Sequence, residues 1–310
     1  MEKKKIDILC VGEILIDMIG DEIANNLAQT KSFSKYVGGS TTNVAKNMAQ
    51  LGLNAALVAS IGDDGLGQFI SEKLGSTPLN LQNISIKKGQ STSLILVSRT
   101  FGTPEFIPYR QADYCIEENQ ISTTLLKNSK LFHTTCFALS KNPAQTVILQ
   151  KAKEAFENGC QLSIDLNYAQ KIWGDTKVLP ILKTYCQYQP LIKLSDDDAF
   201  RIFNKHLSDK EIFEYFINLG AKMICLTKGK DGAFIAQNNK DIVFMPAPKV
   251  SKIADATGAG DAFWSGFLAG YLKKLSLEKC LQTANNLVAI KIQHVGGLPA
   301  DISLEQILIK

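Results

Sequence analysis

The stretch "DATGAGDAF", Asp255 to Phe263, places two acidic residues around a turn of small residues and leads directly into an apolar segment. Gly258, Ala259 and Gly260 have little or no side chain, so their backbone N–H groups can stay open where a helix begins. Free N–H donors and the helix dipole both favour an anion at such a position. The stretch therefore predicts a phosphate-binding turn at the start of a helix.

Asp261 follows this turn, and its negative charge would repel a phosphate unless the carboxylate had a task of its own. Taking a proton from a hydroxyl that attacks the phosphate is such a task. The structural alternative is that Asp261 stabilises the first helical turn. Ala262, Gly266 and Gly270, spaced by four, also indicate a tightly packed helix face. Taken alone, the stretch leaves both interpretations open.

Around this stretch, short apolar runs alternate with longer amphipathic segments, which is typical of βαβ units around a buried, mostly parallel sheet. The predicted strands span residues 7–12, 55–62, 130–135, 161–167, 190–195 and 222–227. The predicted helices span residues 41–50, 64–74, 143–158, 209–219, 259–274 and 277–293. We therefore expect a single α/β domain over residues 1–310.

Residues 91–107, "STSLILVSRTFGTPEFI", break the alternation because they form two extended runs joined by a Gly-containing turn. Residues 17–23, "DMIGDEI", supply a further extended run. No helix is available to cover this hairpin, so we expect a small β-sheet that projects from the main domain. Segments 13–36 and 91–112 would form it, either as an ordinary edge or as a functional lid.

Composition narrows the class of protein. With 310 residues, of which 45% are hydrophobic, the chain can bury a sizeable core. The net charge of +4 comes from dispersed lysines, so no nucleic-acid partner is expected. The sequence contains neither a transmembrane-length apolar segment nor a signal-cleavage pattern, so no membrane partner is expected. Seven cysteines without a C-x-x-C pair, with only three histidines, predict reduced thiols and a cytoplasmic location.

Two motifs together resemble a known family. "DATGAGDAFWSGF" is similar to the C-terminal signature D-T-x-G-A-G-D-x-F of the ribokinase-like (PfkB) sugar kinases, and "VGGSTTNVAKNMAQLG" is similar to their Gly-Gly signature. "GEILIDMI", "SIGDDGLGQFI" and "TKGKDGAF" resemble further segments of that family in the same order. The resemblance covers almost the whole chain and implies a three-layer α/β/α fold. Other nucleotide-binding motifs, G-x-x-x-x-G-K-[ST] and G-x-G-x-x-G after a strand, are absent from the sequence.

The resemblance implies transfer of the ATP γ-phosphate to a sugar hydroxyl. Asp261 would be the general base, and the amides of Gly258, Ala259 and Gly260 would form an anion hole. The expected substrate is a small neutral sugar, most simply fructose. The alternatives are 2-keto-3-deoxygluconate kinase, ribokinase and nucleoside kinase. From other classes, a non-catalytic sugar-binding or regulatory protein of the same fold stays open, and a dehydrogenase is disfavoured by the missing dinucleotide motif.

The resemblance also assigns binding residues. A short carboxylate and an amide can bind paired hydroxyls, and glycines let a sugar approach the backbone. The implied sugar contacts are Asp17, Gly38, Gly39, Asn43, Arg110, Asn167 and Asp261. The implied nucleotide contacts are Lys193, Thr227, Gly229, Gly232, Gly258, Gly260 and Asn285.

The sequence departs from the family pattern at the metal positions. The magnesium element N-x-x-E reads "SDDD", so Asp198 stands where Glu is usual and would act through a water. Asp255 and Thr257, together with "VGGLPA", suggest a monovalent-cation site, although Ala300 stands where some members have Ser. The expected cofactors are ATP and Mg²⁺, with K⁺ as a further option.

A third departure concerns the substrate. Ala169 stands where acid-sugar kinases and many fructose kinases carry Arg. A buried carboxylate needs such a charged partner, so we expect a neutral sugar, unless Lys171 reaches the same pocket. The expected partners are therefore ATP and a small-molecule sugar. Pairing of two copies through the lid is a further option that the resemblance offers.

Overall fold

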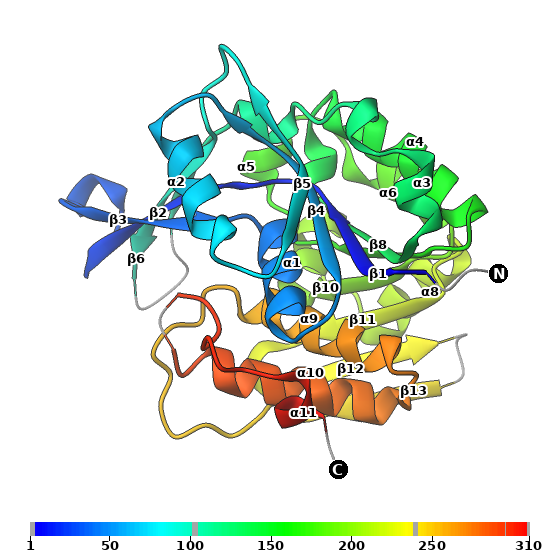
Figure 1. The fold of residues 1–310 in the computed structure, drawn as a ribbon. Helices are drawn as coiled ribbons and strands as arrows, with labels where there is room; N and C mark the ends of the chain where they lie inside the picture. Colours follow the sequence, from blue (N-terminus) through cyan, green and yellow to red (C-terminus); the bar gives the residue numbers. More distant parts are fainter. Residues whose placement is uncertain (1–3, 101–104, 238–240, 295, 309–310) are drawn as a thin grey trace.

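Strand β1 (Ile6–Val11) lies inside a sheet because it carries apolar side chains on both of its faces. Leu9 and Val11 pack in a hydrophobic cluster on one face, and Ile8 and Cys10 pack in a second cluster on the other face. Successive strand residues point to opposite faces, so such a run needs cover on both sides. The computed structural model describes residues 4–100, 105–237, 241–294 and 296–308, and in it helices supply that cover (Figure 1).

The central sheet has nine strands in the order β13-β12-β11-β10-β9-β8-β1-β4-β5. The strands paired in parallel with β1 and with one another are β4 (Ala55–Gly62), β5 (Asn80–Lys87), β8 (Ser129–Thr135), β9 (Gln161–Asp165), β10 (Leu191–Ser195) and β11 (Met223–Thr227). At one edge, β12 (Ala233–Gln237) and β13 (Asp241–Met245) are antiparallel. All six predicted strands are confirmed, whereas β5, β12 and β13 were not predicted.

Helices cover both faces of this sheet, which confirms the three-layer prediction. One face carries α1 (Ser40–Gln50), α2 (Gly65–Gly75), α9 (Ala259–Leu272), α10 (Leu277–Lys291) and the short α11 (Leu304–Ile307). The other face carries α3 (Thr123–Lys127), α4 (Ala144–Glu157), α5 (Gln170–Trp173), α6 (Val178–Cys186), α7 (Asp196–Phe203) and α8 (Asp209–Asn218). The six predicted helices are confirmed, with their ends shifted by at most two residues.

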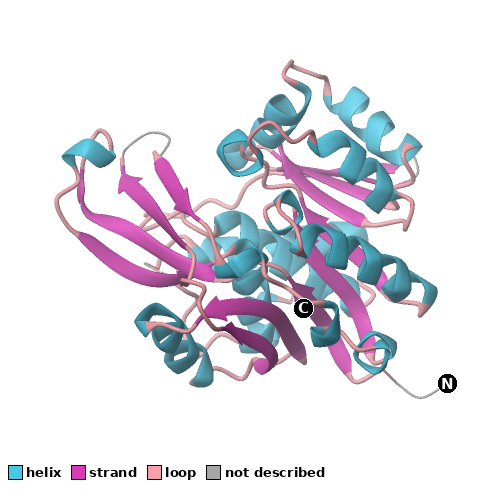
Figure 2. Ribbon diagram, turned by 90° about the horizontal axis from the view of Figure 1, so that it is seen from above, coloured by secondary structure: helices cyan, strands magenta, loops and turns pink. Residues whose placement is uncertain are grey.

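A separate four-stranded sheet projects from the side of the central domain (Figures 1 and 2). Its order is β3 (Phe33–Gly38), β2 (Leu15–Ile23), β6 (Leu94–Arg99) and β7 (Phe106–Tyr109). Strands β2 and β6 are parallel, while β2–β3 and β6–β7 are antiparallel. The predicted Gly-containing turn at residues 101–104 lies outside the described residues. We call these four strands the small sheet.

The chain order fixes where the two sheets meet. Strand β2 follows β1 closely, and β3 leads directly into α1, so the small sheet joins the central domain beside the start of α1. Helices α1 and α9 pack against each other on the same face. Both signature stretches therefore come together at this junction. Within the described ranges, no helix combines the length and apolar character that crossing a membrane requires.

Candidate active site

The small-residue turn begins α9 as predicted. Gly258 precedes the helix with a φ of 73°, a left-handed conformation that favours glycine. The amide of Ala259 already donates to the carbonyl of Ala256 at 3.1 Å. Of the three predicted anion-binding amides, those of Gly258 and Gly260 are therefore the better candidates for an incoming phosphate.

Asp261, in the first turn of α9, is held by two side chains of α1. Ser40 Oγ donates to its Oδ1 at 2.6 Å, and Asn43 Nδ2 donates to its Oδ2 at 2.9 Å. Burial raises the pKa of Asp261 to about 6, helped by the negative charge of Asp165, while the bonds from Ser40 and Asn43 lower it. The carboxylate is thus fixed in direction, and its pKa lies close to neutral pH. Both properties suit a general base.

Asp17, on β2, faces the same region. Burial first, and then the charge of Asp261, raises the pKa of Asp17 to about 7. Gly38 on β3 is packed against it, since a Cβ added to Gly38 would lie 2.0 Å from Asp17 Oδ2. Gly39 has a φ of 101° and precedes α1. The Gly-Gly pair therefore leaves room for the Asp17 carboxylate and turns the chain into α1.

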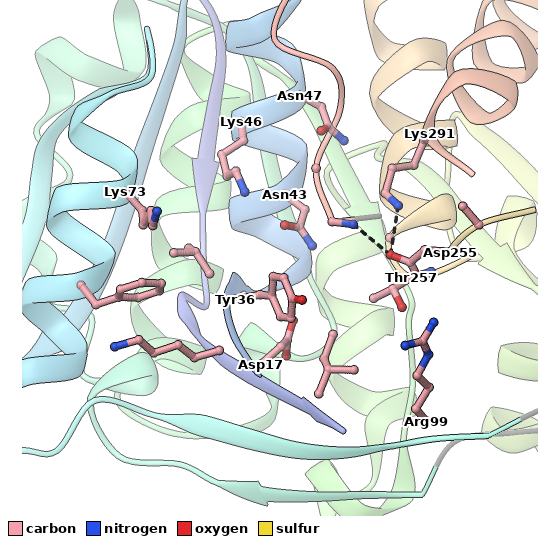
Figure 3. A pocket seen from close by; sticks show the side chains of 18 of the residues that line it. Asp17, Tyr36, Asn43, Lys46, Asn47, Lys73, Arg99, Asp255, Thr257 and Lys291 are labelled. Carbon is pink, nitrogen blue, oxygen red and sulfur yellow. Dashed lines mark hydrogen bonds and ion pairs between the residues drawn. The ribbon is translucent and has the colours of Figure 1, made fainter. Parts of the chain in front are cut away.

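A cavity of about 490 Å³ lies where the small sheet meets α1, α2 and the turn before α9 (Figure 3). This volume is typical of small-molecule sites. The predicted residues that line it are Asp17, Asn43, Asp255, Thr257 and Gly258. Asp261 lies directly beside them, because its Oδ2 is 3.8 Å from the position of a Cβ on Gly258. The structure thus brings residues from both signature stretches to one cavity.

A buried ion pair lies next to the turn. Lys193 Nζ contacts both carboxylate oxygens of Asp165, at 2.8 and 3.0 Å, and both side chains are almost fully buried. A Cβ on Gly260 would lie 3.2 Å from this Nζ, so Lys193 is directly beside the predicted anion hole. Asn167 lies two residues after Asp165, beyond the end of β9. Its Oδ1 is buried without a hydrogen-bond partner among the described residues.

The other predicted nucleotide residues do not line this cavity. Thr227 ends β11, and Gly229 and Gly232 lie in the connection to β12, both with positive φ. Asn285, on α10, donates to the carbonyl of Pro246 at 2.7 Å. Thr227, Gly229 and Gly232 lie at or after the carboxyl end of the parallel strand β11, where α/β proteins usually bind ligands.

The residues predicted to hold cations are engaged by the protein. Asp198 Oδ2 accepts from the backbone N–H and hydroxyl of Ser195, and its Oδ1 accepts from the backbone of Tyr168. Among the described residues there is no group of three His, Cys, Asp or Glu side chains that suits a metal ion. The described part of the chain therefore offers no ready cage for magnesium, which in such sites is held largely by phosphates and water.

Asp255, predicted to bind a monovalent cation, already forms an ion pair with a lysine. Its two carboxylate oxygens accept from the backbone amides of Thr257, at 2.9 Å, and Gly296, at 3.2 Å. Lys291 Nζ lies 3.5 Å from Oδ2, and the Lys291 side chain is 5% exposed. The lysine ammonium supplies positive charge at this position (Figure 3).

Three residues that bear on substrate choice lie away from the cavity. Arg110 forms a buried ion pair with Asp113 at 2.6 Å and also donates to Ser140 Oγ, so most of its donors are satisfied internally. Ala169 precedes α5 and packs at the edge of the hydrophobic core. Lys171 donates to the carbonyl of Phe106 at 3.4 Å on the small sheet, instead of pointing into the cavity.

Three contributors were missed at the level of sequence. Ser40 donates a hydrogen bond to Asp261, and the sequence feature that could have identified it was its place inside the Gly-Gly signature. Glu13, fully buried, accepts from Thr41 and Thr135 and so anchors the start of α1 to the strands. The sequence feature that could have identified Glu13 was an acidic residue inside an apolar run. Lys46 lines the cavity one helical turn after Asn43, and this spacing was the available signal.

Comparison with known proteins identifies the family. Residues 5–302 match the model of the pfkB family carbohydrate kinases, so the chain belongs to this family. An ATP-dependent 6-phosphofructokinase of Thermoanaerobacterium thermosaccharolyticum is 35% identical over 96% of this chain and 91% of its own length. The chain is therefore a carbohydrate kinase, and its similarity to proteins named as fructokinases makes it a fructokinase-like member.

Solved structures agree with this assignment. The fructokinase of Halothermothrix orenii is 30% identical, with a TM-score of 0.79 over 90% of this chain and 98% of that one. A putative ribokinase II from E. coli, solved with ATP and Mg²⁺, shares the fold at 20% identity, with a TM-score of 0.86 over 97% of each chain. ATP is thus bound by a neighbour of the same fold.

Proposed function

We propose that this kinase transfers the γ-phosphate of ATP to a hydroxyl of a ketohexose with the carbon skeleton of fructose. The observation that carries the proposal is the fixed position of Asp261, held by Ser40 and Asn43 beside the turn that begins α9. In the proposed step, the Asp261 carboxylate accepts the hydroxyl proton, the sugar oxygen bonds to the γ-phosphorus, and ADP leaves.

The surrounding residues have complementary roles in this proposal. Asp17 and Asn43 bind sugar hydroxyls in the cavity, and Gly38, which has no side chain, leaves the Asp17 carboxylate room to take its position. The amides at Gly258 and Gly260, at the positive end of α9, receive the transferring phosphate. Lys193 adds a positive charge beside them. Such fixed charges stabilise the transition state because they need no rearrangement.

The nucleotide is proposed to extend along the carboxyl edge of the sheet toward Thr227, Gly229, Gly232 and Asn285. This direction continues from the turn at α9 and follows the general placement of ligands on α/β sheets. Magnesium would be carried by the phosphates, because the carboxylate of Asp198 is engaged by its own helix. A potassium ion near Asp255 would have to compete with the ammonium of Lys291.

An acid sugar is the less favourable alternative. Its carboxylate would need a charged partner, and two positions considered for this task do not supply one, because Arg110 is paired with Asp113 and Ala169 carries no charge. Lys171 is held by the small sheet. A neutral ring needs only the hydroxyl partners already named, which supports fructose. The two relatives named for fructose chemistry differ in one respect, since one name refers to free fructose and the other to its phosphate.

ADP release with a panel of sugars tests the proposal. We expect turnover with fructose or a fructose phosphate, and Asp261→Asn should lower kcat by about 10² to 10⁴, the usual contribution of a positioned base. Asp63→Asn, an exposed carboxylate change outside the cavity, is the matched control. Near-normal kcat in a well-folded Asp261 variant would remove this residue from the mechanism. Sugar binding without ADP release would instead indicate a non-catalytic member.

A further inference from the structure

Two loops meet at the carboxyl end of α10, on the wall of the cavity. One loop contains Asp255 and leads into the turn at Gly258, and the other follows α10. Backbone hydrogen bonds hold the first loop to this helix end, because the amides of Ala254 and Asp255 donate to the carbonyl of Ile292 at 2.8 and 3.3 Å. The position of the turn before α9 therefore depends on the end of α10.

Negative charge gathers at this junction. The last carbonyl groups of a helix have no donor within the helix, and the helix dipole adds partial negative charge there. Asp255 adds the full charge of a carboxylate whose side chain is 20% exposed. Its two oxygens accept from the backbone amides of Thr257 and Gly296, which are neutral donors. A carboxylate this well covered needs a cation beside it.

Lys291, the last residue of α10, supplies that cation. Its Nζ lies 3.5 Å from Asp255 Oδ2 and donates to the carbonyl of His294 at 3.4 Å, so the ammonium contacts both loops. The Lys291 side chain is 5% exposed, and its Cε lies 3.8 Å from the position of a Cβ on Gly258. The stem thus packs against the turn before α9, while the ammonium joins the loops on either side (Figure 3).

A monovalent metal ion does not fit beside this lysine. The sequence pattern suggested that Asp255 and Thr257 bind such an ion, which would need the carboxylate that Lys291 already contacts. A second cation there would lie close to the buried ammonium, and like charges repel strongly where water is largely excluded. The ammonium is also attached to the chain, so it loses none of the translational freedom that a dissolved ion loses on binding.

We propose that Lys291 is a built-in cation, which takes the place of a monovalent metal ion and makes this kinase independent of potassium. Lys291 does not touch the reacting atoms in this role. It is a positioning residue that fixes Gly258 and, through it, the start of α9. The kinetic part of the inference rests on the proposed function, because the turn at Gly258 is there proposed to receive the phosphate. It does not depend on which sugar reacts.

The wild type is measured first, in the chlorides of potassium, sodium and tetramethylammonium at equal ionic strength, with buffer and nucleotide exchanged to the same cation. Tetramethylammonium is too large for the position of Lys291 Nζ and serves as the inert salt. We expect kcat to differ by less than about twofold between the salts. The melting temperature should not depend on the salt either, since an ion that does not bind adds no stability.

Lys291→Ala should convert the protein into a cation-dependent kinase. In tetramethylammonium chloride, its kcat should fall at least about tenfold and its melting temperature should drop, because the uncompensated charge of Asp255 displaces the turn. Potassium should restore most of both values by binding in the vacated space, and so should n-propylammonium, which carries the atoms that the substitution removes. Lys291→Met keeps most of the stem and loses the charge, and it replaces Lys291→Ala if that variant does not fold.

Two further variants show whether charge is the property that matters. Lys291→Arg keeps the charge, so in tetramethylammonium chloride it should retain more activity than Lys291→Ala and gain less from potassium. Lys279→Ala removes an exposed lysine from the same helix and is the matched control. We expect its kcat and melting temperature to be as independent of the salt as those of the wild type.

The melting temperature separates this inference from the proposed function. If no sugar is turned over, but potassium raises the melting temperature of Lys291→Ala and not that of the wild type, the built-in cation stands and the proposed function fails. Three results would overturn the built-in cation. One is a wild type that potassium activates several-fold. Another is a folded Lys291→Ala that works equally well in every salt. A third is a loss in Lys291→Ala that no cation restores, which would make Lys291 a packing residue.

Discussion

Asp261 shows how burial prepares an ordinary carboxylate for acid–base chemistry. Its pKa is raised to about 6 by burial, and the hydrogen bonds from Ser40 and Asn43 keep it from rising further. A base must be deprotonated to act, so activity should be fully developed above about pH 7 and lost as the pH falls through about 6. Asp17, whose pKa is raised to about 7, titrates in the same range. The pH profile of kcat/KM therefore reports on both carboxylates together.

Removing the side-chain amide of Asn43 should shift the pH at which kcat/KM falls on the acid side of the profile, which is its acid limb. In Asn43→Ala, Asp261 loses a hydrogen bond that favours its charged form, so its pKa rises and the limb moves to higher pH. The position of the limb, rather than the height of the profile, is the readout, because sugar binding also weakens. Asn47→Ala is the control, since Asn47 contacts Ser265 instead. An unchanged limb in Asn43→Ala would show that Asp261 does not govern the profile.

Gly38 is constrained by the side chain it faces. A Cβ there would lie 2.0 Å from the Asp17 carboxylate, so Gly38→Ala must push Asp17 out of place. We expect the sugar KM to rise at least about tenfold, because misplaced contacts in a site typically cost this much or more, while the KM for ATP changes little. Gly75→Ala, where nothing lies within 4 Å of the added Cβ, is the control. Equal changes in both KM values would indicate general damage.

At the scale of elements, the site depends on two helices held in register. Ser40 and Asn43 on α1 bind Asp261 on α9, and Asn47 binds Ser265 one turn further along. Glu13 fixes the start of α1 by accepting from the amide and hydroxyl of Thr41. Several bonds along one interface restrict sliding, so Asp261, the proposed general base, is positioned by secondary structure rather than by a loop.

The small sheet is the other element that forms the cavity, because β2, β3 and β6 all contribute lining residues. If it excludes water from the transferring phosphate, shortening the β6–β7 connection at residues 101–104 should raise the sugar KM and increase ATP hydrolysis without sugar. The melting temperature should change little. Shortening the β12–β13 connection at residues 238–240 is the control. Lost stability with unchanged kinetics would make the small sheet an ordinary edge.

At the scale of the whole molecule, a polar pair lies between two apolar layers. Lys193 and Asp165 are 6% and 1% exposed, and they connect neighbouring strands β10 and β9. Removing one partner of a buried pair leaves an uncompensated charge, which typically costs about 3–5 kcal/mol. Lys193→Met should therefore lower the free energy of unfolding by about this amount, measured in urea.

The double variant Lys193→Met/Asp165→Leu should recover much of that stability, because no lone charge remains. It should not recover activity, since Lys193 also lies beside Gly260. A single Lys193→Met change that leaves the unfolding midpoint unaltered would mean that the pair does not contribute to stability. Recovered activity in the double variant would remove Lys193 from the phosphate site.

Local sequence patterns were enough to predict the layers of the fold and the separate segments of the site. A strand such as β1 follows from a short continuous apolar run, and a helix such as α9 follows from a longer apolar run that begins at a turn of small residues. Neighbouring residues carry both patterns within a few positions. The two signature stretches, read together, indicated the family. Within each stretch, the spacing of Gly39 and Asn43, or of Gly258 and Asp261, follows from the geometry of a turn entering a helix.

Which of these segments come into contact depends on the packing of the folded chain. Ser40 and Asp261 are 221 residues apart in sequence and 2.6 Å apart in space. The pairing of Arg110 with Asp113 and the gathering of Lys35 and Lys73 on Phe69 likewise needed coordinates. Charge interactions and desolvation depend on distance and burial, which a linear pattern does not contain. For that reason the sequence pointed to Asp261 as the proposed general base, while the folded chain revealed that Ser40 and Asn43 hold it.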